Sequence, residues 1–291
     1  MNASATLLKS SMPHELFGYE ILESIGDGAG SRIYAAVHPK TKQLCAVKHV
    51  ICTDEKDQRF VEQLKSELAV GQRVNHPGLR KSLDFQVNKT WLGKVTDAIL
   101  VLELFDGIPL DRELPPTLPG IVEAFIQVAA ALHSLHQLGF VHCDLKPANI
   151  LRAADGAIKV IDLGQGCPFN TRKPRIQGTP DFISPEQVRC DYVTVRTDVF
   201  NFGATLYWCL CGQKLPTLFT VCKGENSFLL DTQISSPRDI NPDVPENLSN
   251  LVMECVRTKA EKRPADLQEV GRRLEVVLYG MRRPAKTAMA V

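Results

Sequence analysis

The hydrophobic pattern of this chain changes its period near Asp106, and that change restricts the fold more than any other feature of the sequence. From Tyr19 to Val50, the segments YEILESI, SRIYAAVH and QLCAVKHVI alternate or are solidly apolar, as β-strands are. The segment AILVLEL is also strand-like, and Gly107 and Pro109 interrupt the chain soon after it. These patterns predict a β-rich lobe that ends near Asp106.

Beyond this boundary the pattern is mostly helical. Between Pro119 and Gly139 the apolar residues recur at helical spacing, at Ile121, Phe125, Val128, Leu132 and Leu135. Thr197 can cap the segment VFNFGATLYWCLC, which is apolar on nearly every face and therefore predicts a buried helix. Two further helices are expected at about 246–257 and 266–278.

Together these patterns predict an α+β fold with two lobes. The β-rich N-lobe is expected over residues 16–105 and the mainly helical C-lobe over residues 106–280. Residues 1–15 and 281–291 are expected to be tails, and the first of them to be flexible.

Composition excludes several classes of protein. Of the 291 residues 44% are apolar, which suffices for a large core, and 34 Lys and Arg against 33 Asp and Glu leave a net charge of +1. Such a balance offers no field for gripping nucleic acid or an anionic membrane surface. The longest apolar stretches fall short of the roughly 20 residues of a membrane span. Because the first residues also lack the apolar core of a signal peptide, the cytoplasm is the expected compartment.

Cysteine usage excludes two further classes. The nine cysteines are scattered and contain no CxxC pair, a pattern that fits neither a disulfide framework nor a zinc site. Most of them are therefore expected to be reduced, small core residues.

A charged residue on an apolar helix face points to the first functional pair. Glu67 shares one helical face with Phe60, Leu64, Leu68 and Val74. An unpaired carboxylate there would suffer a large desolvation penalty, so it needs a cation, and Lys48 on the preceding strand is available. The alternatives are that Lys48 is an ordinary solvent-facing lysine and that Glu67 lies at the edge of the apolar stripe.

A glycine cluster lies between two predicted strands, from Gly26 through Gly28 and Gly30 to Ser31. It predicts either a simple β-turn or a loop whose bare backbone N–H groups approach phosphates. Since a strand and not a helix follows, the cluster fits neither a P-loop nor a dinucleotide-binding turn.

The densest chemical signal is the segment VHCDLKPANIL, which brings Asp144, Lys146 and Asn149 into one short loop. Soon afterwards the strand IKVID delivers Asp162 into a Leu-Gly pair. Phosphoryl transfer needs these groups: a carboxylate that orients the nucleophile, a cation for the developing charge, and oxygens for a hard metal ion. The alternative is the ordinary turn chemistry of Asp and Asn.

In this order the motifs resemble the eukaryotic-type (Hanks-type) serine/threonine protein kinase catalytic domain, in a form similar to bacterial members, from about Tyr19 to Leu278. The elements that carry the resemblance are the glycine-rich loop, Lys48, Glu67, HCD at 142–144, Asn149, DLG at 162–164, SPE at 184–186, Asp198 and Arg263. The family pattern pairs the last of these, Arg263, with Glu186. Lys146 and the segment GTPDFISPE resemble serine/threonine kinases more than tyrosine kinases.

The resemblance implies a role for each matching residue. Lys48, paired with Glu67, would hold the α- and β-phosphates of ATP, Asp144 would accept the hydrogen bond of the substrate hydroxyl, and Lys146 would steady the transferred phosphoryl group. Asn149 and Asp162 would hold Mg²⁺. The remaining nucleotide-binding positions implied are Ile25, Gly26, Gly28, Ser31, Ile33, Ala46, Leu102, Glu103, Phe105 and Leu151. The substrate would be a protein with Ser or Thr hydroxyls, and the pattern leaves room for a regulatory partner or a dimer.

Three positions depart from the family pattern. Ser31 stands where the third glycine of the loop is expected, and Cys143 stands in place of the arginine that normally receives an activation-loop phosphate. Gly71 replaces a bulky apolar residue one turn after Glu67, which predicts a loose helix seam. A weakly active, ATP-binding scaffold is therefore the alternative to an active kinase, whereas Lys146 argues against a small-molecule kinase of the aminoglycoside type.

Overall fold

The computed structural model of the chain describes residues 12–28, 30–221 and 234–283, which divide into two compact units. The first unit contains the chain up to Leu68 together with Ser82–Leu104, and the second contains Ala69–Lys81 and the chain from Phe105 onward. The predicted tails at 1–15 and 281–291 lie mostly outside the described residues. Where they are described, the first strand already begins at Glu15 and the last helix continues to Arg282.

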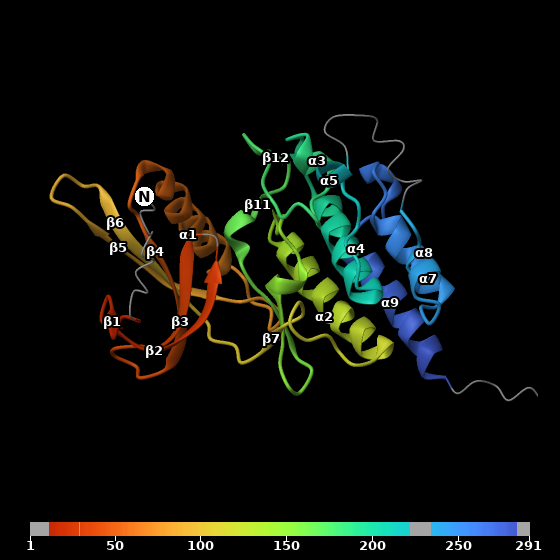
Figure 1. The fold of residues 1–291 in the computed structure, drawn as a ribbon, viewed down its shortest axis with the longest axis horizontal. Helices are drawn as coiled ribbons and strands as arrows, with labels where there is room; N and C mark the ends of the chain where they lie inside the picture. Colours follow the sequence, from red (N-terminus) through yellow and green to blue (C-terminus); the bar gives the residue numbers. More distant parts are fainter. Residues whose placement is uncertain (1–11, 29, 222–233, 284–291) are drawn as a thin grey trace, which may run out of the picture. The chain divides into compact units, whose positions relative to one another are not determined.

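The first unit is built on a six-stranded antiparallel sheet with the strand order β1-β2-β3-β4-β6-β5 (Figure 1). Its strands are β1 (Glu15–Leu16), β2 (Tyr19–Gly28), β3 (Ser31–Val37), β4 (Leu44–Ile51), β5 (Ser82–Lys89) and β6 (Val95–Leu102). A short 3-10 helix, η1 (Glu55–Asp57), leads into helix α1 (Gln58–Gly71).

Two apolar clusters bury both faces of this sheet at its centre. Val47 of β4 belongs to one cluster, and its neighbour Ala46 belongs to the other, because successive side chains point to opposite faces of a strand. Val61 and Leu64 of α1 lie in the second cluster, so this helix covers that face. The predicted helical face is confirmed for Leu64, whereas Val74 lies beyond the end of α1.

The second unit is mainly helical. Its long helices are α2 (Leu118–Gln137), α4 (Val195–Cys211), α8 (Glu246–Cys255) and α9 (Leu267–Arg282), and its short ones are α3 (Pro185–Val188), α5 (Leu218–Val221) and α7 (Pro237–Ile240). The apolar residues predicted for α2, from Ile121 to Leu135, are all buried in one large core. That core also takes in Val70, Val74 and Leu79, which explains why residues 69–81 pack with this unit although the sequence pattern placed them in the first lobe.

Short strands and 3-10 turns carry the connecting loops of the second unit. A three-stranded sheet contains β7 (Ile108–Pro109), β9 (Ile150–Arg152) and β10 (Ile158–Val160). Two small pairs join β8 (Phe140–Val141) to β11 (Cys167–Pro168) and β12 (Thr171–Arg172) to β13 (Tyr192–Val193). The 3-10 turns are η2 (Pro147–Asn149), η3 (Leu163–Gln165) and η4 (Ala260–Lys262).

The start of α4 corrects one sequence prediction. The N-cap is Thr194, whose side chain accepts a hydrogen bond from the Arg196 backbone N–H. The Thr197 hydroxyl accepts a bond from the Thr194 backbone N–H, which completes a capping box. The apolar run begins only after Thr197, which is why the sequence pattern predicts the cap at that residue.

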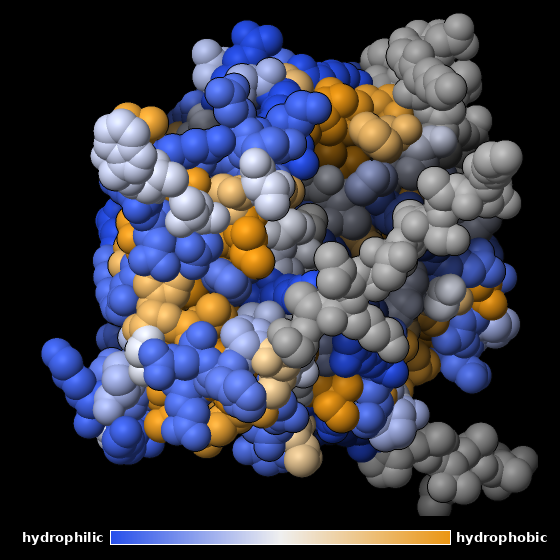
Figure 2. Space-filling view, turned by 60° about the vertical axis from the view of Figure 1, so that its left-hand side comes forward, coloured by the Kyte–Doolittle hydropathy of each residue, from blue (hydrophilic) through white to orange (hydrophobic). Residues whose placement is uncertain are grey.

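Within the described ranges, α2 alone is long and apolar enough to cross a membrane. Half of its most apolar 18-residue window is buried inside the protein, and the core helix of a globular domain passes the same test, so this is weak evidence for a span. On the face shown in Figure 2, hydrophilic residues predominate and hydrophobic residues form separate patches.

Candidate active site

The lysine and glutamate predicted to pair do so in the first unit. Lys48 Nζ lies 2.8 Å from Glu67 Oε2, and only 12% of the lysine side chain and 2% of the glutamate side chain are exposed. Ser82 anchors the helix beside this pair, since its hydroxyl donates a 3.1 Å hydrogen bond to the Glu67 carbonyl. Lys48 is thus not a solvent-facing strand lysine, and α1 holds Glu67 against β4 with Gly71 as its last residue.

The glycine-rich loop joins β2 to β3 in the same unit, with Gly28 opposite Ser31 in the register. Gly30 has φ +77°, and a Cβ atom there would lie 2.4 Å from the Phe60 ring, so both conformation and space demand glycine. At Gly28 a Cβ would meet the Ser31 hydroxyl at 2.7 Å. The serine that replaces the third glycine is therefore packed against the loop and is 9% exposed.

Several of the residues predicted to contact the nucleotide base share one face of the first sheet. Ala46 lies opposite Leu102 in the register, both are buried, and Ile33 packs in the same cluster. Ile25, in contrast, is 41% exposed. Glu103 directly follows β6, after Leu102. The nucleotide-binding roles of these residues remain predictions.

Two more of the predicted base contacts belong to the second unit. Leu151 lies in β9, opposite Pro109 and Lys159 in the register. The Lys159 ammonium lies 5.2 Å from the centre of the Phe105 ring, within the range of a cation–π contact.

In the second unit, hydrogen bonds from Thr179 and Lys146 fix the carboxylate of Asp144, which lies in the loop after β8. Its Oδ1 accepts bonds from the backbone N–H and the hydroxyl of Thr179, each at 2.8 Å. Lys146 Nζ lies 3.2 Å from Asp144 Oδ2 and donates a 2.9 Å bond to the Thr179 hydroxyl. One ammonium thus bridges the carboxylate and the threonine.

A fully buried carboxylate, Asp198 of α4, shapes the backbone before Asp144. Its oxygens accept hydrogen bonds from the backbone N–H groups of His142 and Cys143, at 2.7 and 2.9 Å, and its Oδ2 lies 2.8 Å from His136 Nε2. Burial alone would raise the pKa of Asp198, but the bonds from His136 and His142 outweigh it and lower that pKa below its ordinary value. Cys143 has φ +64°, a conformation that these anchors hold in place.

Asn149 and Asp162 are the residues whose fit to a metal ion can be tested. Asn149 Nδ2 donates a 2.8 Å bond to the Asp144 carbonyl, so its amide oxygen is the atom left for another ligand, and its own carbonyl accepts the Ile161 N–H at 2.9 Å. Asp162 follows with φ +64°. Among the described residues, no three carboxylate, His or Cys side chains form a metal cage. Two oxygen donors suit Mg²⁺, which usually binds one or two protein oxygens together with substrate phosphates.

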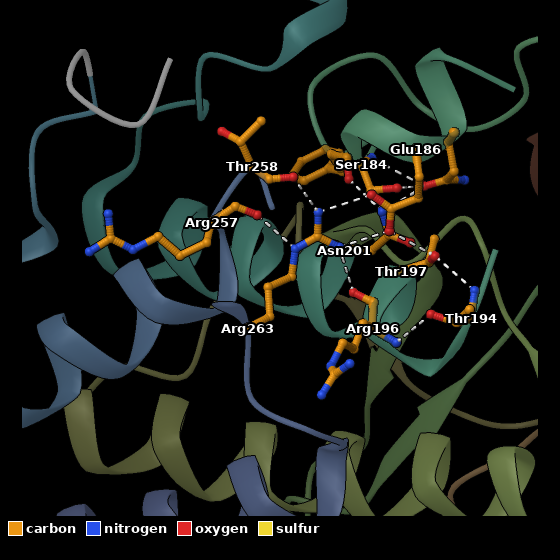
Figure 3. Close-up of polar contacts among 11 residues, drawn as sticks. Ser184, Glu186, Thr194, Arg196, Thr197, Asn201, Arg257, Thr258 and Arg263 are labelled. Atoms are coloured by element: carbon orange, nitrogen blue, oxygen red, sulfur yellow. Dashed lines mark hydrogen bonds and ion pairs between the residues drawn. The ribbon is translucent and has the colours of Figure 1, made fainter. Parts of the chain in front are cut away.

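The segment from Gly178 to Gln187 is tied to the core of the second unit. Gln187 Nε2 donates a 2.7 Å bond to the Cys143 carbonyl, and its Oε1 accepts bonds from Ser184 and from Asn201. Arg263 forms two bonds to the Glu186 carboxylate, at 2.7 and 2.9 Å, as the family pattern implied (Figure 3).

These contacts lead to the comparison with known proteins. The sequence model of the protein kinase domain matches residues 19–272. The chain belongs to the protein kinase family. Protein kinases use ATP and divalent metal ions to phosphorylate protein substrates.

The relatives that match are bacterial serine/threonine protein kinases. The DNA damage-responsive serine/threonine-protein kinase RqkA of Deinococcus radiodurans is 30% identical over 264 residues, which is 84% of this chain and 37% of the relative. A probable serine/threonine-protein kinase of Clostridium acetobutylicum is 28% identical over 87% of this chain and 38% of the relative. PknB of Mycobacterium tuberculosis is 31% identical over 67% of this chain and 32% of the relative. The chain therefore spans about a third of the length of these relatives.

Sequence reasoning did not single out His136, Gln187 or Asn201. All three are buried, and each contacts a group far away in the sequence. His136 contacts Asp198, Gln187 donates a hydrogen bond to the Cys143 carbonyl, and Asn201 donates one to the Phe182 carbonyl. A histidine at the end of an apolar helix and a glutamine after SPE are ordinary in composition, so no local signal could have identified them.

Proposed function

We propose that this chain is a serine/threonine protein kinase that transfers the γ-phosphoryl group of Mg-ATP to Ser or Thr hydroxyls of proteins. The observation that carries the proposal is the contact set of Asp144, in which Lys146 and Thr179 hold one carboxylate between two loops of the second unit. Family membership and the kinase relatives support the same reading.

In this proposal the second unit's residues act on the acceptor hydroxyl. An Asp144 oxygen accepts the hydroxyl's hydrogen bond and orients its oxygen for in-line attack, while Lys146, already beside that carboxylate, places positive charge near the group in transfer. Asn149 and Asp162 would hold Mg²⁺, which when bound neutralises charge on the phosphates. Lys48, oriented by Glu67, would bind the α- and β-phosphates from the first unit.

The decisive test separates phosphoryl transfer from nucleotide binding. The purified chain is incubated with γ-labelled ATP, a mixture of Ser/Thr peptides, and either MgCl₂ or EDTA, and labelled residues are mapped by mass spectrometry. We expect Mg²⁺-dependent labelling at Ser and Thr, which Asp144→Asn abolishes while a nucleotide-induced rise in melting temperature persists. If the chain bound Mg-ATP but labelled nothing, it would be a kinase-shaped scaffold and the proposal would fail.

Two further properties of this kinase are proposed. One is a cytoplasmic location, in line with the sequence expectation. We also propose that a partner or a second copy of the chain regulates the kinase through the seam at Gly71. If partner contacts tighten that seam, Gly71→Leu should raise kcat in the absence of a partner. An unchanged kcat in a stable Gly71→Leu variant would count against it.

A further inference from the structure

The thiol of Cys143, the residue directly before Asp144, faces the thiol of Cys167 in the second unit. Cys143 Sγ and Cys167 Sγ are 3.9 Å apart. Cys143 follows β8 and Cys167 lies in β11, and these two strands pair with Cys167 opposite Val141. All eight cysteines that the structure describes are free thiols.

We propose that Cys143 and Cys167 are a redox modification site, at which a hydroperoxide converts the two thiols into a reversible disulfide. A disulfide has an S–S distance of about 2.05 Å, so the sulfurs must approach by about 1.9 Å from their present 3.9 Å separation. In the register Cys167 lies opposite Val141, two residues before Cys143, so it is the 3.9 Å approach of the two sulfurs, not strand pairing at Cys143 itself, that places the thiols within reach of a disulfide after a small movement.

The two thiols differ in access and in acidity, which divides their roles. Cys167 is half-buried, whereas Cys143 is 1% exposed, so an oxidant reaches Cys167 first. The pKa of Cys167 is lowered to about 7, chiefly by the hydrogen bond from Cys143. The charge of Lys173 and a bond from Thr171 lower it further, whereas burial and the charge of Asp198 raise it. The same thiol–thiol bond, burial and Asp198 raise the pKa of Cys143. Cys167 is therefore the nucleophile and Cys143 the resolving thiol.

The chemistry balances with hydrogen peroxide as the oxidant. The Cys167 thiolate attacks one peroxide oxygen, the O–O bond breaks, and the departing hydroxide takes a proton to leave as water, which yields a sulfenic acid. The Cys143 sulfur then attacks the Cys167 sulfur, the S–O bond breaks, and the thiol proton of Cys143 leaves with the hydroxide as a second water. Two thiols and one peroxide thus give one disulfide and two waters.

The movement that closes the bond falls on the side of Cys167. The Cys143 backbone is held on both sides, by Asp198 through its N–H and by Gln187 through its carbonyl. Cys167 lies in a two-residue strand, β11, five positions after Asp162. The disulfide would tie this strand to the residue that precedes Asp144. The effect of this disulfide on phosphoryl transfer rests on the proposed function, but the formation of the disulfide does not.

The test measures the bond itself, without ATP. The reduced full chain is treated with equimolar hydrogen peroxide, remaining thiols are alkylated, and peptides are mapped without reduction. We expect a Cys143–Cys167 linked peptide, a loss of two hydrogens, and complete reversal by dithiothreitol. Absence of the link, or a link of Cys167 to another cysteine, would overturn the proposal.

Variants then separate the two roles. Cys143→Ser should stop at the Cys167 sulfenic acid, which dimedone traps, while Cys167→Ser should leave Cys143 unmodified at the same peroxide dose. Cys190→Ser is the matched control, because Cys190 is also a half-buried thiol of this unit, and it should retain the link within twofold of wild type. Efficient dimedone trapping at Cys143 in Cys167→Ser would contradict the assigned order. Since the wild-type peptide map needs no substitution, the proposal stays testable even if a variant fails to fold.

Discussion

Replacing Glu186 with Ala should destabilise the second unit strongly, because it would leave the Arg263 guanidinium buried without a counter-charge. The Arg263 side chain is 0% exposed and the Glu186 side chain 13%. Besides its two bonds to Glu186, the guanidinium donates to the carbonyls of Arg196, Arg257 and Thr258 (Figure 3). Those carbonyls satisfy its N–H groups but supply no full negative charge.

The expected magnitude follows from this burial. Removing one partner of a buried ion pair typically lowers the free energy of unfolding by about 3–5 kcal/mol. In a unit of this size each kcal/mol shifts the melting temperature by about 2–4 °C, so we expect a fall of about 10 °C. Urea unfolding followed by far-UV circular dichroism gives the same difference from the shift in midpoint at unchanged slope.

A second bidentate pair in the same unit provides the control. Arg273 lies 2.6 and 2.8 Å from the two oxygens of Glu254, but the two side chains are 36% and 43% exposed. Glu254→Ala should therefore lose only about 0.2–1 kcal/mol. If Glu186→Ala and Glu254→Ala lowered stability equally, burial would not be the cause and the reasoning would be wrong.

Three further predictions concern the site. Lys48→Met should reduce peptide phosphorylation at least a hundredfold without unfolding the chain, and near-wild-type turnover would refute its assignment. Thr179→Ala should lose most activity because it removes a bond to the Asp144 carboxylate, whereas Thr171→Ala should keep most of it; a large loss in Thr171→Ala that Thr171→Glu restores would contradict this. Alkylation of Cys167 should be half-maximal near pH 7, since the thiolate is the reactive form above its pKa of about 7. Lys173→Met should move that midpoint to higher pH and Lys173→Arg should not, and identical profiles would exclude the lysine as a cause.

Sequence patterns predict the parts of this site that rest on local chemistry. Glu67 was placed beside a cation because a carboxylate on an apolar helix face cannot remain unpaired, and the structure confirms that the cation is Lys48. Helix α2 was predicted from its spacing because a buried helix face repeats with the helical period.

What could not be predicted depends on contacts between distant segments. Residues 69–81 carry no pattern that distinguishes the two units. The buried side chains of Val70, Val74 and Leu79 and backbone hydrogen bonds to Val160 place them in the second unit. The Cys143–Cys167 pair was equally hidden, because 24 positions separate the thiols and only the register of β8 with β11 brings them together. The N-cap of α4 was misplaced because Thr194 and Thr197 have the same side chain and share one capping box.

The anchors of the loop before Asp144 explain how residue 143 can be a cysteine. Asp198 binds the backbone N–H of Cys143 and Gln187 binds its carbonyl, so neither contact uses the side chain at this position. Asp198 is fixed in turn by His136. A small side chain that tolerates φ +64° and fits the buried cluster around position 143 could therefore stand there without moving the loop. The position is free to carry a second chemistry, and in this chain that chemistry is a thiol directed at Cys167.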